Sequence, residues 1–228
     1  MSNERHGPCI GVLGGSGGVG VSSLAAAIAA CAGPAVLIDL DVHGGGMDVL
    51  LGIEKEAGTR WSGLHSDGGR IDPGEVAAAL PRWGEVSVLS CDRDELPPAA
   101  VRSVLVAARA LGPVVVDLGR GWSAARDAAL ADCDLVAVVV RATVHGVAVA
   151  ARVVARVSRW HLVVAPGGSL TRRKVSGALG ATEALVLDFD RALADRAGAG
   201  LDPRALRRST RVLAGRLLGA AQLRLAAA

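Results

Sequence analysis

The residues with the clearest chemical potential lie in a glycine-rich stretch near the start of the chain, GGSGGVGVSS at 14–23. An apolar run before it predicts a strand at 9–14, and an alanine-rich run after it predicts a helix at 22–32. Backbone N–H groups at the start of a helix attract anions, and glycines let the backbone approach them closely. The stretch therefore predicts a phosphate-binding site formed by nine residues: Gly15, Ser16, Gly17, Gly18, Val19, Gly20, Val21, Ser22 and Ser23.

The nucleotide-binding pattern G-x-x-x-x-G-K-[ST] fits this stretch from Gly15 to Ser22 with one departure. Ser22 stands where the pattern places a hydroxyl that binds Mg²⁺, but Val21 stands where it places a lysine. Glycine-rich turns after a first strand are common in α/β folds. The stretch alone therefore leaves open whether it binds a nucleotide or only turns the chain.

Three aspartates at the ends of apolar runs favour a nucleotide site. Asp39 and Asp41 close the run VLIDLDV, and Asp117 closes the run VVVD. Ligands of α/β proteins bind at the carboxyl ends of the strands, and a carboxylate fixed there can face Mg²⁺ or its waters. Each aspartate alone could instead cap a helix or a turn. Three of them together with the glycine-rich loop make that alternative weak.

Short β-branched runs alternate with alanine-rich stretches, which is typical of a parallel sheet covered by helices on both faces. The expected strands are 9–14, 35–40, 85–90, 113–118, 134–140, 161–165 and 184–188. The expected helices are 22–32, 72–80, 98–111, 123–132, 144–159, 170–179, 190–198 and 203–226. We predict a three-layer α/β fold with a mostly parallel, twisted sheet of about seven strands, formed by a single domain over residues 1–228.

The composition narrows the class of protein. The net charge of +3 is small, which argues against an obligate nucleic-acid binder. No apolar run reaches the ~20 residues that cross a bilayer. The four cysteines have neither metal-ligand spacing nor a disulfide pattern, as in a reducing compartment. We expect a cytoplasmic protein.

With these motifs in place, the chain resembles the MinD/ParA group of deviant Walker A proteins, whose loop reads K-G-G-x-G-K-[ST]. SGGVGVS at 16–22 matches it in frame. VLIDLDVHGGGMDVLLG at 36–52 resembles the group's first switch, which includes Asp48, and VVVDLGRG resembles its second switch, which includes Gly119 and Arg120. GTRWSGL at 58–64 and ALPRWGEVSVLSCDRDE at 79–95 resemble the CpaE/TadZ branch of pilus-assembly proteins, and more narrowly actinobacterial CpaE-like proteins, some described as septum-site-determining.

The resemblance implies a homodimer that depends on ATP and Mg²⁺, binds a surface and positions pilus, secretion or division machinery. A lysine at the position of Ser16 would reach the partner's nucleotide, and one at the position of Val21 would hold the β- and γ-phosphates. Asp41 would position the attacking water. Ser22, Asp39 and Asp117 would bind the magnesium ion.

This chain departs from that pattern at both lysines, Ser16 and Val21. Each lysine would supply a charge-assisted hydrogen bond of about 1.5–3 kcal/mol, so ATP affinity is expected to fall by roughly two to four powers of ten. The preferred hypothesis is a degenerate spatial organiser, linked to Tad/Flp-type pilus assembly or secretion or to septum-site placement. It would bind ATP weakly or not at all.

Two alternatives stay open. The chain could be a competent Mg-ATPase of the CpaE/MinD type in which arginine replaces lysine, with Arg120 and Arg141 as the candidates. It could also be a ParA-like partitioning protein that associates with DNA. The small net charge and the lack of a basic stripe make nucleic acid the less expected partner.

The expected terminal helix, 203–226, has two different sides. Arg204, Arg207, Arg208 and Arg211 share one side, opposite Leu206, Leu213 and Leu217. The preferred interpretation is a helix that packs its leucines on the sheet with its arginines in solvent. Peripheral contact with the inner face of the cell membrane, or with a partner, is the alternative.

Overall fold

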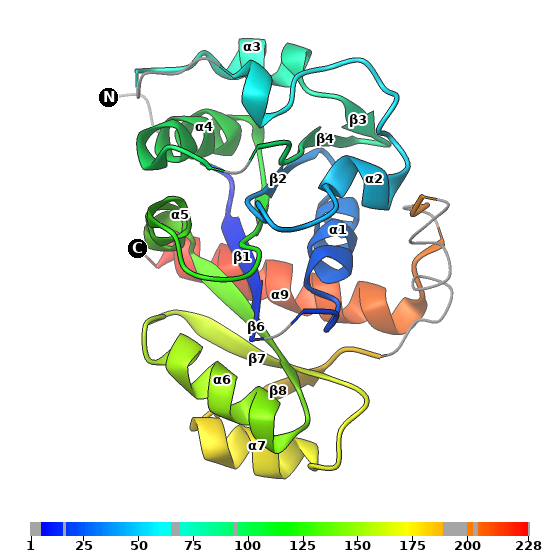
Figure 1. Ribbon diagram of the computed structural model, residues 1–228, viewed down its shortest axis with the longest axis vertical. Coiled ribbons are helices and arrows are strands. Elements are labelled where there is room, and N and C mark those ends of the chain that lie inside the picture. Colours follow the sequence, from blue (N-terminus) through cyan, green and yellow to red (C-terminus); the bar gives the residue numbers. More distant parts are fainter. Residues whose placement is uncertain are drawn as a thin grey trace.

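The computed structural model describes residues 6–15, 17–64, 69–93, 95–188, 200–202 and 205–227. Within them an eight-stranded sheet has the order β3-β4-β2-β5-β1-β6-β7-β8 (Figure 1). Its strands are β1 (Cys9–Gly14), β2 (Ala35–Asp39), β3 (Arg82–Trp83), β4 (Val86–Leu89), β5 (Val114–Asp117), β6 (Leu135–Arg141), β7 (Trp160–Ala165) and β8 (Ala184–Val186). The described pairings are all parallel except that of β3 with β4.

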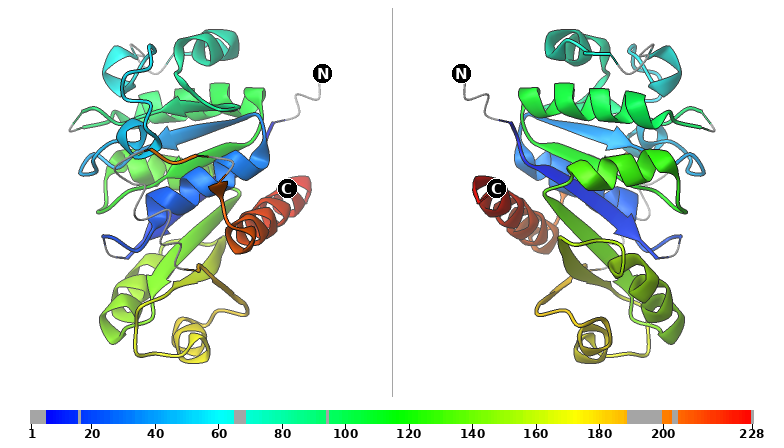
Figure 2. Two further views of the ribbon diagram at one scale, coloured as in Figure 1. Left: turned by 90° about the vertical axis from the view of Figure 1, so that its right-hand side faces the viewer. Right: turned by 90° about the vertical axis from the view of Figure 1, so that its left-hand side faces the viewer.

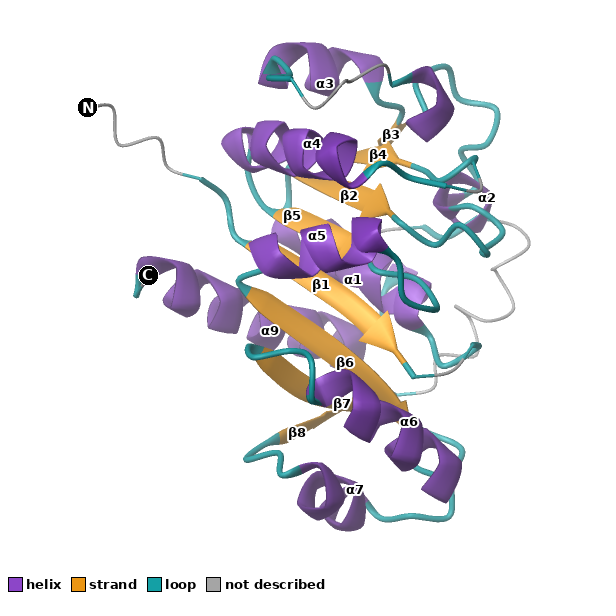
Figure 3. Cartoon of the chain, turned by 60° about the vertical axis from the view of Figure 1, so that its left-hand side comes forward, coloured by secondary structure: helices purple, strands orange, loops and turns teal. Residues whose placement is uncertain are grey.

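Helices cover both faces of the sheet and complete three layers (Figures 2 and 3). One face carries α3 (Pro73–Ala79), α4 (Pro98–Leu111), α5 (Ala124–Asp132), α6 (Val144–Val154) and α7 (Arg172–Leu179). The other carries α1 (Val21–Ala32), α2 (Met47–Leu51) and α9 (Arg208–Ala226). The predicted three-layer α/β fold with a mostly parallel sheet is therefore confirmed.

The inner strands are apolar throughout because neither of their faces meets water. All residues of β2, β4 and β5 are buried, and the core consists mainly of valine, leucine, isoleucine and alanine. Since β1, β2 and β5 are parallel neighbours, their carboxyl ends open on the same edge of the sheet. That edge carries the glycine-rich loop and the three aspartates.

The seven predicted strands are all present, with ends that differ by one or two residues. The sequence did not predict β3, because two residues beside a tight turn give no periodic signal. It also did not predict α2 or the 3₁₀ turn at Trp61–Gly63, in the glycine-rich region 43–80.

Two predicted helix boundaries were wrong. The helix expected at 144–159 ends at Val154, and the one expected from 203 begins at Arg208. Residues 203 and 204 lie outside the described residues, and residues 205–207 precede the helix. The helix expected at 190–198 also lies outside the described residues.

Candidate nucleotide-binding site

The glycine-rich loop joins β1 to α1 and borders a cavity of about 290 Å³. Gly20, directly before α1, has a φ of 92°, a left-handed conformation that a side chain would strain. Since α1 begins without a side-chain cap, its first N–H groups are left for an anion. Of the nine predicted nucleotide-binding residues, seven line the cavity: Gly17, Gly18, Val19, Gly20, Val21, Ser22 and Ser23.

The other two predicted residues of the loop have different positions. A Cβ on Gly15 would lie 3.0 Å from Val149 Cγ1, so Gly15 is in contact with α6 instead of the cavity. Ser16 lies outside the described residues. The loop therefore presents its residues 17–23 to the cavity.

Asp117 combines burial with an unused ligand atom. Its Oδ1 accepts the N–H of Gly119 at 3.0 Å, whereas Oδ2 is buried without a hydrogen-bond partner. Burial raises the pKa of this carboxyl group, while the nearby Ser22 hydroxyl and the Gly119 N–H favour its ionised form. An unpartnered carboxylate oxygen beside a serine hydroxyl is a donor set that suits Mg²⁺. Ser22 and Asp117 therefore fit the predicted metal site.

Asp39 lies beside Asp117, since the two residues pair in register on β2 and β5. Its Oδ1 accepts the N–H of Asp41 at 2.9 Å, and its Oδ2 accepts those of Met47 at 3.0 Å and Cys91 at 3.3 Å. Burial, and then the charge of Asp117, raise the pKa of Asp39 to about 7. Asp39 thus holds three backbone segments together next to the candidate metal ligands.

Asp41 meets the second loop, residues 118–123, at the edge of the cavity. Its Oδ2 accepts the Nε–H of Arg120 at 3.3 Å, and the same guanidinium donates to the carbonyl of His43. Gly119, at a φ of 64°, approaches so closely that a Cβ there would lie 2.6 Å from Asp41 Cα. The structure therefore brings Asp41, Gly119 and Arg120 together.

Two arginines bring positive charge near the glycine-rich loop. A Cβ on Gly17 would lie 3.3 Å from Arg120 Nη1, and Arg120 is the one cationic residue among the described residues that line the cavity. Arg141, at the end of β6, donates from Nη2 to the Gly18 carbonyl at 3.0 Å. Val21 is partly exposed at the cavity. Both arginines named from the sequence thus contact the phosphate-binding loop.

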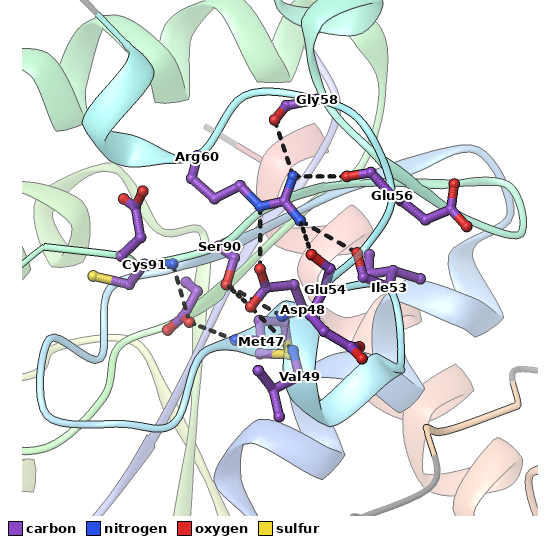
Figure 4. A network of polar contacts seen from close by, with 12 residues as sticks. Met47, Asp48, Val49, Ile53, Glu54, Glu56, Gly58, Arg60, Ser90 and Cys91 are labelled. Carbon is purple, nitrogen blue, oxygen red and sulfur yellow. Dashed lines mark hydrogen bonds and ion pairs between the residues drawn. The ribbon is translucent and has the colours of Figure 1, made fainter.

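Asp48 lies away from the cavity, at the start of α2, in a polar network that Figure 4 shows. Its Oδ2 accepts the Nε–H of Arg60 at 3.1 Å, and its Oδ1 accepts the hydroxyl of Ser90 at 2.8 Å. Trp61, which directly follows Arg60, is buried and donates from Nε1 to the carbonyl of Asp39 at 2.8 Å. Sequence reasoning assigned no role to Arg60, Trp61 or Ser90. The motif GTRWSGL was the available signal.

A further arginine lies under the second loop. Arg126 of α5 is 3% exposed and donates from Nη1 to the carbonyl of Gly121, while its Nε and Nη2 have no partner. Its guanidinium carbon lies 4.5 Å from the centre of the Trp122 ring, and that of Arg156 lies 4.6 Å from it. Burial lowers the pKa of Arg126 to about 10, while Asp127, Asp117 and Asp41 favour its charged form. Arg126 therefore remains a cation at neutral pH.

The terminal helix α9 packs on the sheet. Leu213 and Leu217 are buried against α1, and Leu206, which precedes the helix, is also buried. Arg207, Arg208 and Arg211 are exposed, as predicted, while Arg204 lies outside the described residues. Among the described residues, no helix is both long and apolar enough to cross a membrane.

Solved structures share this fold. The ParA family ATPase from Chlorobium tepidum TLS matches with a TM-score of 0.74 at 15% identity, over 96% of this chain and 98% of that one. The MinC:MinD cell division protein complex of Aquifex aeolicus matches with a TM-score of 0.70 at 20% identity, over 93% and 96%. The septum site-determining protein MinD complexed with Mg-ADP from Pyrococcus horikoshii OT3 gives 0.67 at 13% identity, over 95% of both chains. The chain therefore has the fold of the MinD/ParA P-loop ATPases.

Sequence comparison adds two relatives from Mycobacterium tuberculosis, the uncharacterized proteins MT3760 of strain CDC 1551 and Rv3660c of strain H37Rv. Each is 44% identical over 148 residues, which is 64% of this chain and 42% of the relative. The matched region thus spans less than half the length of these curated relatives. No protein-family model matches the chain.

Proposed function

We propose that this chain is a MinD/ParA-like spatial organiser that binds Mg-nucleotide weakly and acts chiefly by binding partners. The observation that carries the proposal is a nearly complete phosphate site without a lysine at position 21. Among the described residues that line it, the one cation, Arg120, is paired with Asp41. The MinC:MinD complex supports action through a protein partner. We further propose a homodimer that serves pilus, secretion or septum-site machinery.

The proposed metal ligands are Ser22 and Asp117, because Asp117 keeps one buried oxygen without a partner. The Mg-ADP complex with the MinD fold supports this assignment. A bound Mg²⁺ would offset the negative charge of the phosphates. Asp39, which we assign to the edge of the same site, holds the surrounding backbone through its three N–H partners.

The proposed weakness of turnover follows from the position of Asp41. A carboxylate that orients water needs a free acceptor position, but Asp41 Oδ1 accepts the N–H of His43 at 3.2 Å and Oδ2 accepts the Nε–H of Arg120 at 3.3 Å. A nucleotide phosphate and Asp41 would compete for this guanidinium. A phosphate that draws Arg120 toward itself would therefore weaken the contact of Arg120 with Asp41.

A competent ATPase is the second candidate, and one observation favours it. Arg141 contacts the phosphate-binding loop at the Gly18 carbonyl, so two arginines could together supply the charge of the absent lysines. This candidate predicts tight binding and steady turnover without any engineered lysine.

Calorimetric titration with Mg-ATP separates the two candidates. We expect weak binding by the wild type and, for Val21→Lys, an affinity higher by about tenfold to a hundredfold from one charge-assisted hydrogen bond. Val21→Lys combined with Ser16→Lys should bind more tightly still, and Val21→Met is the control for side-chain size. Phosphate release is followed in parallel. Micromolar binding and steady hydrolysis by the wild type would reject the proposal in favour of the competent ATPase.

A further inference from the structure

Residues 46–61, from the residue before α2 to the first residue of the 3₁₀ turn, are called here the first-switch segment, and the Arg60 side chain lies at the centre of its polar contacts (Figure 4). The Nε–H of Arg60 donates to Asp48 Oδ2 at 3.1 Å. Its terminal nitrogens donate to four backbone carbonyls at 2.9–3.4 Å, those of Ile53, Glu54, Glu56 and Gly58. A guanidinium has five N–H donors, and the five acceptors here match that number. The Arg60 side chain is only 13% exposed. Its bonds to Asp48 and Ile53 are partly buried, and those to Glu54, Glu56 and Gly58 lie at the surface.

Both ends of the first-switch segment are attached to the sheet. At its start, the buried Ser90 after β4 accepts the N–H of Asp48 at 3.1 Å and donates to Asp48 Oδ1 at 2.8 Å. The Met47 N–H is held by Asp39 Oδ2 at 3.0 Å. At its end, Trp61 donates to the Asp39 carbonyl and, through its N–H, to the Ser90 carbonyl. The segment is therefore closed on itself by Arg60 and fixed to β2 and β4.

The segment contributes Leu50 of α2 to one wall of the nucleotide site, and Gly44 and Gly45, which precede the segment, line the same cavity. The opposite wall, the second loop at 118–123, is tied to Asp41 by Arg120, whose side chain is 51% exposed. An exposed pair of this kind contributes about 0–1 kcal/mol and is easily exchanged for another anion. The two walls thus differ in how firmly they are held.

We infer that Arg60 is a positioning residue that fixes the first-switch segment as a rigid wall, so that nucleotide binding moves only the phosphate-binding loop and the second loop. The nucleotide in this inference rests on the proposed function, whereas the positioning role of Arg60, called here the Arg60 clamp, does not. Lysine cannot replace Arg60, because a single ammonium cannot reach Asp48 and four carbonyls arranged around a planar fork.

Hydrogen–deuterium exchange tests both parts on the full chain, with and without Mg-ADP. Without ligand, Arg60→Ala and Arg60→Lys should each speed the exchange of amides 47–58 by about tenfold to a hundredfold, the loss of one or two charge-assisted hydrogen bonds. Arg82→Ala is the matched control, since the partners of Arg82 among the described residues are Ser87 and Glu85 at the sheet edge. Should Arg60→Ala fail to fold, Ser90→Ala removes the hydroxyl that holds Asp48 and should give a smaller increase.

Added Mg-ADP should protect residues 17–23 and 117–123 of the wild type and leave 46–61 unchanged. In the Arg60 variants the protection should extend into 46–61, which a loss of stability alone would not produce. Equal exchange of 47–58 in the wild type and the Arg60 variants, or strong Mg-ADP protection of 46–61 in the wild type, would overturn the inference. If Mg-ADP protects no segment, the proposed function fails, while faster exchange in the Arg60 variants would still support the clamp.

Discussion

Two arginines hold the two loops beside the nucleotide site, and they do so in opposite ways. Arg60 has an acceptor for each of its five N–H donors. Arg126, under the second loop, is more deeply buried, yet its Nε and Nη2 have no partner and its Nη1 bonds to one carbonyl, that of Gly121. Both are cations in contact with a loop at this edge of the sheet, so burial alone does not decide how firmly a loop is held.

The difference lies in what each loop would lose by moving. A buried donor without an acceptor costs about 1–3 kcal/mol, so a rearrangement that gives Arg126 a new partner would lower the energy of the second loop. The first-switch segment can only lose hydrogen bonds. A nucleotide-dependent change therefore costs less on the side of Arg126 and Arg120.

The largest expected effect concerns Asp39 and Asp117, the carboxylates between the two loops. Asp39 ionises near pH 3.8 when unfolded and near 7 in the folded chain, where burial and the charge of Asp117 oppose ionisation. Between these values the folded chain keeps a proton that the unfolded chain has lost. The stabilisation that comes from protonated Asp39 is fully present below about pH 4 and is lost as the pH rises through 7. This loss lowers the free energy of unfolding by up to about 4 kcal/mol. Urea unfolding from pH 4 to pH 8 measures it.

Two variants serve as controls for the pH profile. Asp117→Asn removes the charge that helps to raise the pKa of Asp39, so the loss of stability with rising pH should become smaller. His161 acts in the opposite direction, because burial and the charge of Arg224 lower its pKa and its contribution is lost as the pH falls. His161→Gln removes that contribution. A profile that rises from pH 5 to 8 in His161→Gln would contradict the prediction.

Arg60→Ala should reduce the free energy of unfolding by about 3 kcal/mol. This value is at the lower end of the usual cost of breaking a buried ion pair, because the Arg60 and Asp48 side chains are 13% and 16% exposed. The change leaves the Asp48 carboxylate and four carbonyls with fewer partners. Urea unfolding at pH 5 measures it, with Arg82→Ala as the control, for which about 0.5 kcal/mol is expected. Equal losses in the two variants would show that Arg60 is an ordinary surface arginine.

The sequence predicts the aspartates at the sheet edge better than the two arginines that contact the loops. Asp39, Asp41 and Asp117 follow apolar strands, so strand ends alone place them together at the sheet edge. Arg60 is different, because four of its five acceptors are backbone carbonyls, which every residue carries and no motif identifies. Burial of Arg126 is equally hidden, since an arginine in a helix usually faces solvent.

The tryptophans carried a signal whose meaning only the structure gives. Only two percent of the residues are aromatic, so the tryptophans of GTRWSGL and ALPRWGEVSVLSCDRDE are conspicuous, but the sequence assigns them no physical role. Trp61 donates to the carbonyl of Asp39, and Trp83 donates to that of Leu201 at 2.6 Å. Both motifs therefore attach loops to the sheet, through partners too distant in sequence for a local pattern to predict.

A smaller effect is expected for Arg120→Ala, which tests the exposed contact of the second loop. Stability should change by less than about 0.5 kcal/mol, because the pair with Asp41 is half exposed. Mg-ADP affinity should fall by about tenfold, the loss of one charge-assisted hydrogen bond to phosphate. Calorimetry measures both, with Arg141→Ala for comparison. Tighter binding by Arg120→Ala would show instead that Arg120 blocks the site.

A net effect close to zero is expected for Arg126→Met, the counterpart of Arg60→Ala. Methionine removes two unpartnered buried donors, which favours the variant, and loses the bond to Gly121 and the contact with Trp122, which favours the wild type. Because replacing a poorly satisfied buried charge by an apolar side chain is often neutral, we expect a net change within about 1 kcal/mol. Urea unfolding at pH 7 measures it. A loss as large as that of Arg60→Ala would mean that Arg126 holds its loop as firmly, and the second loop would then be no easier to move than the first.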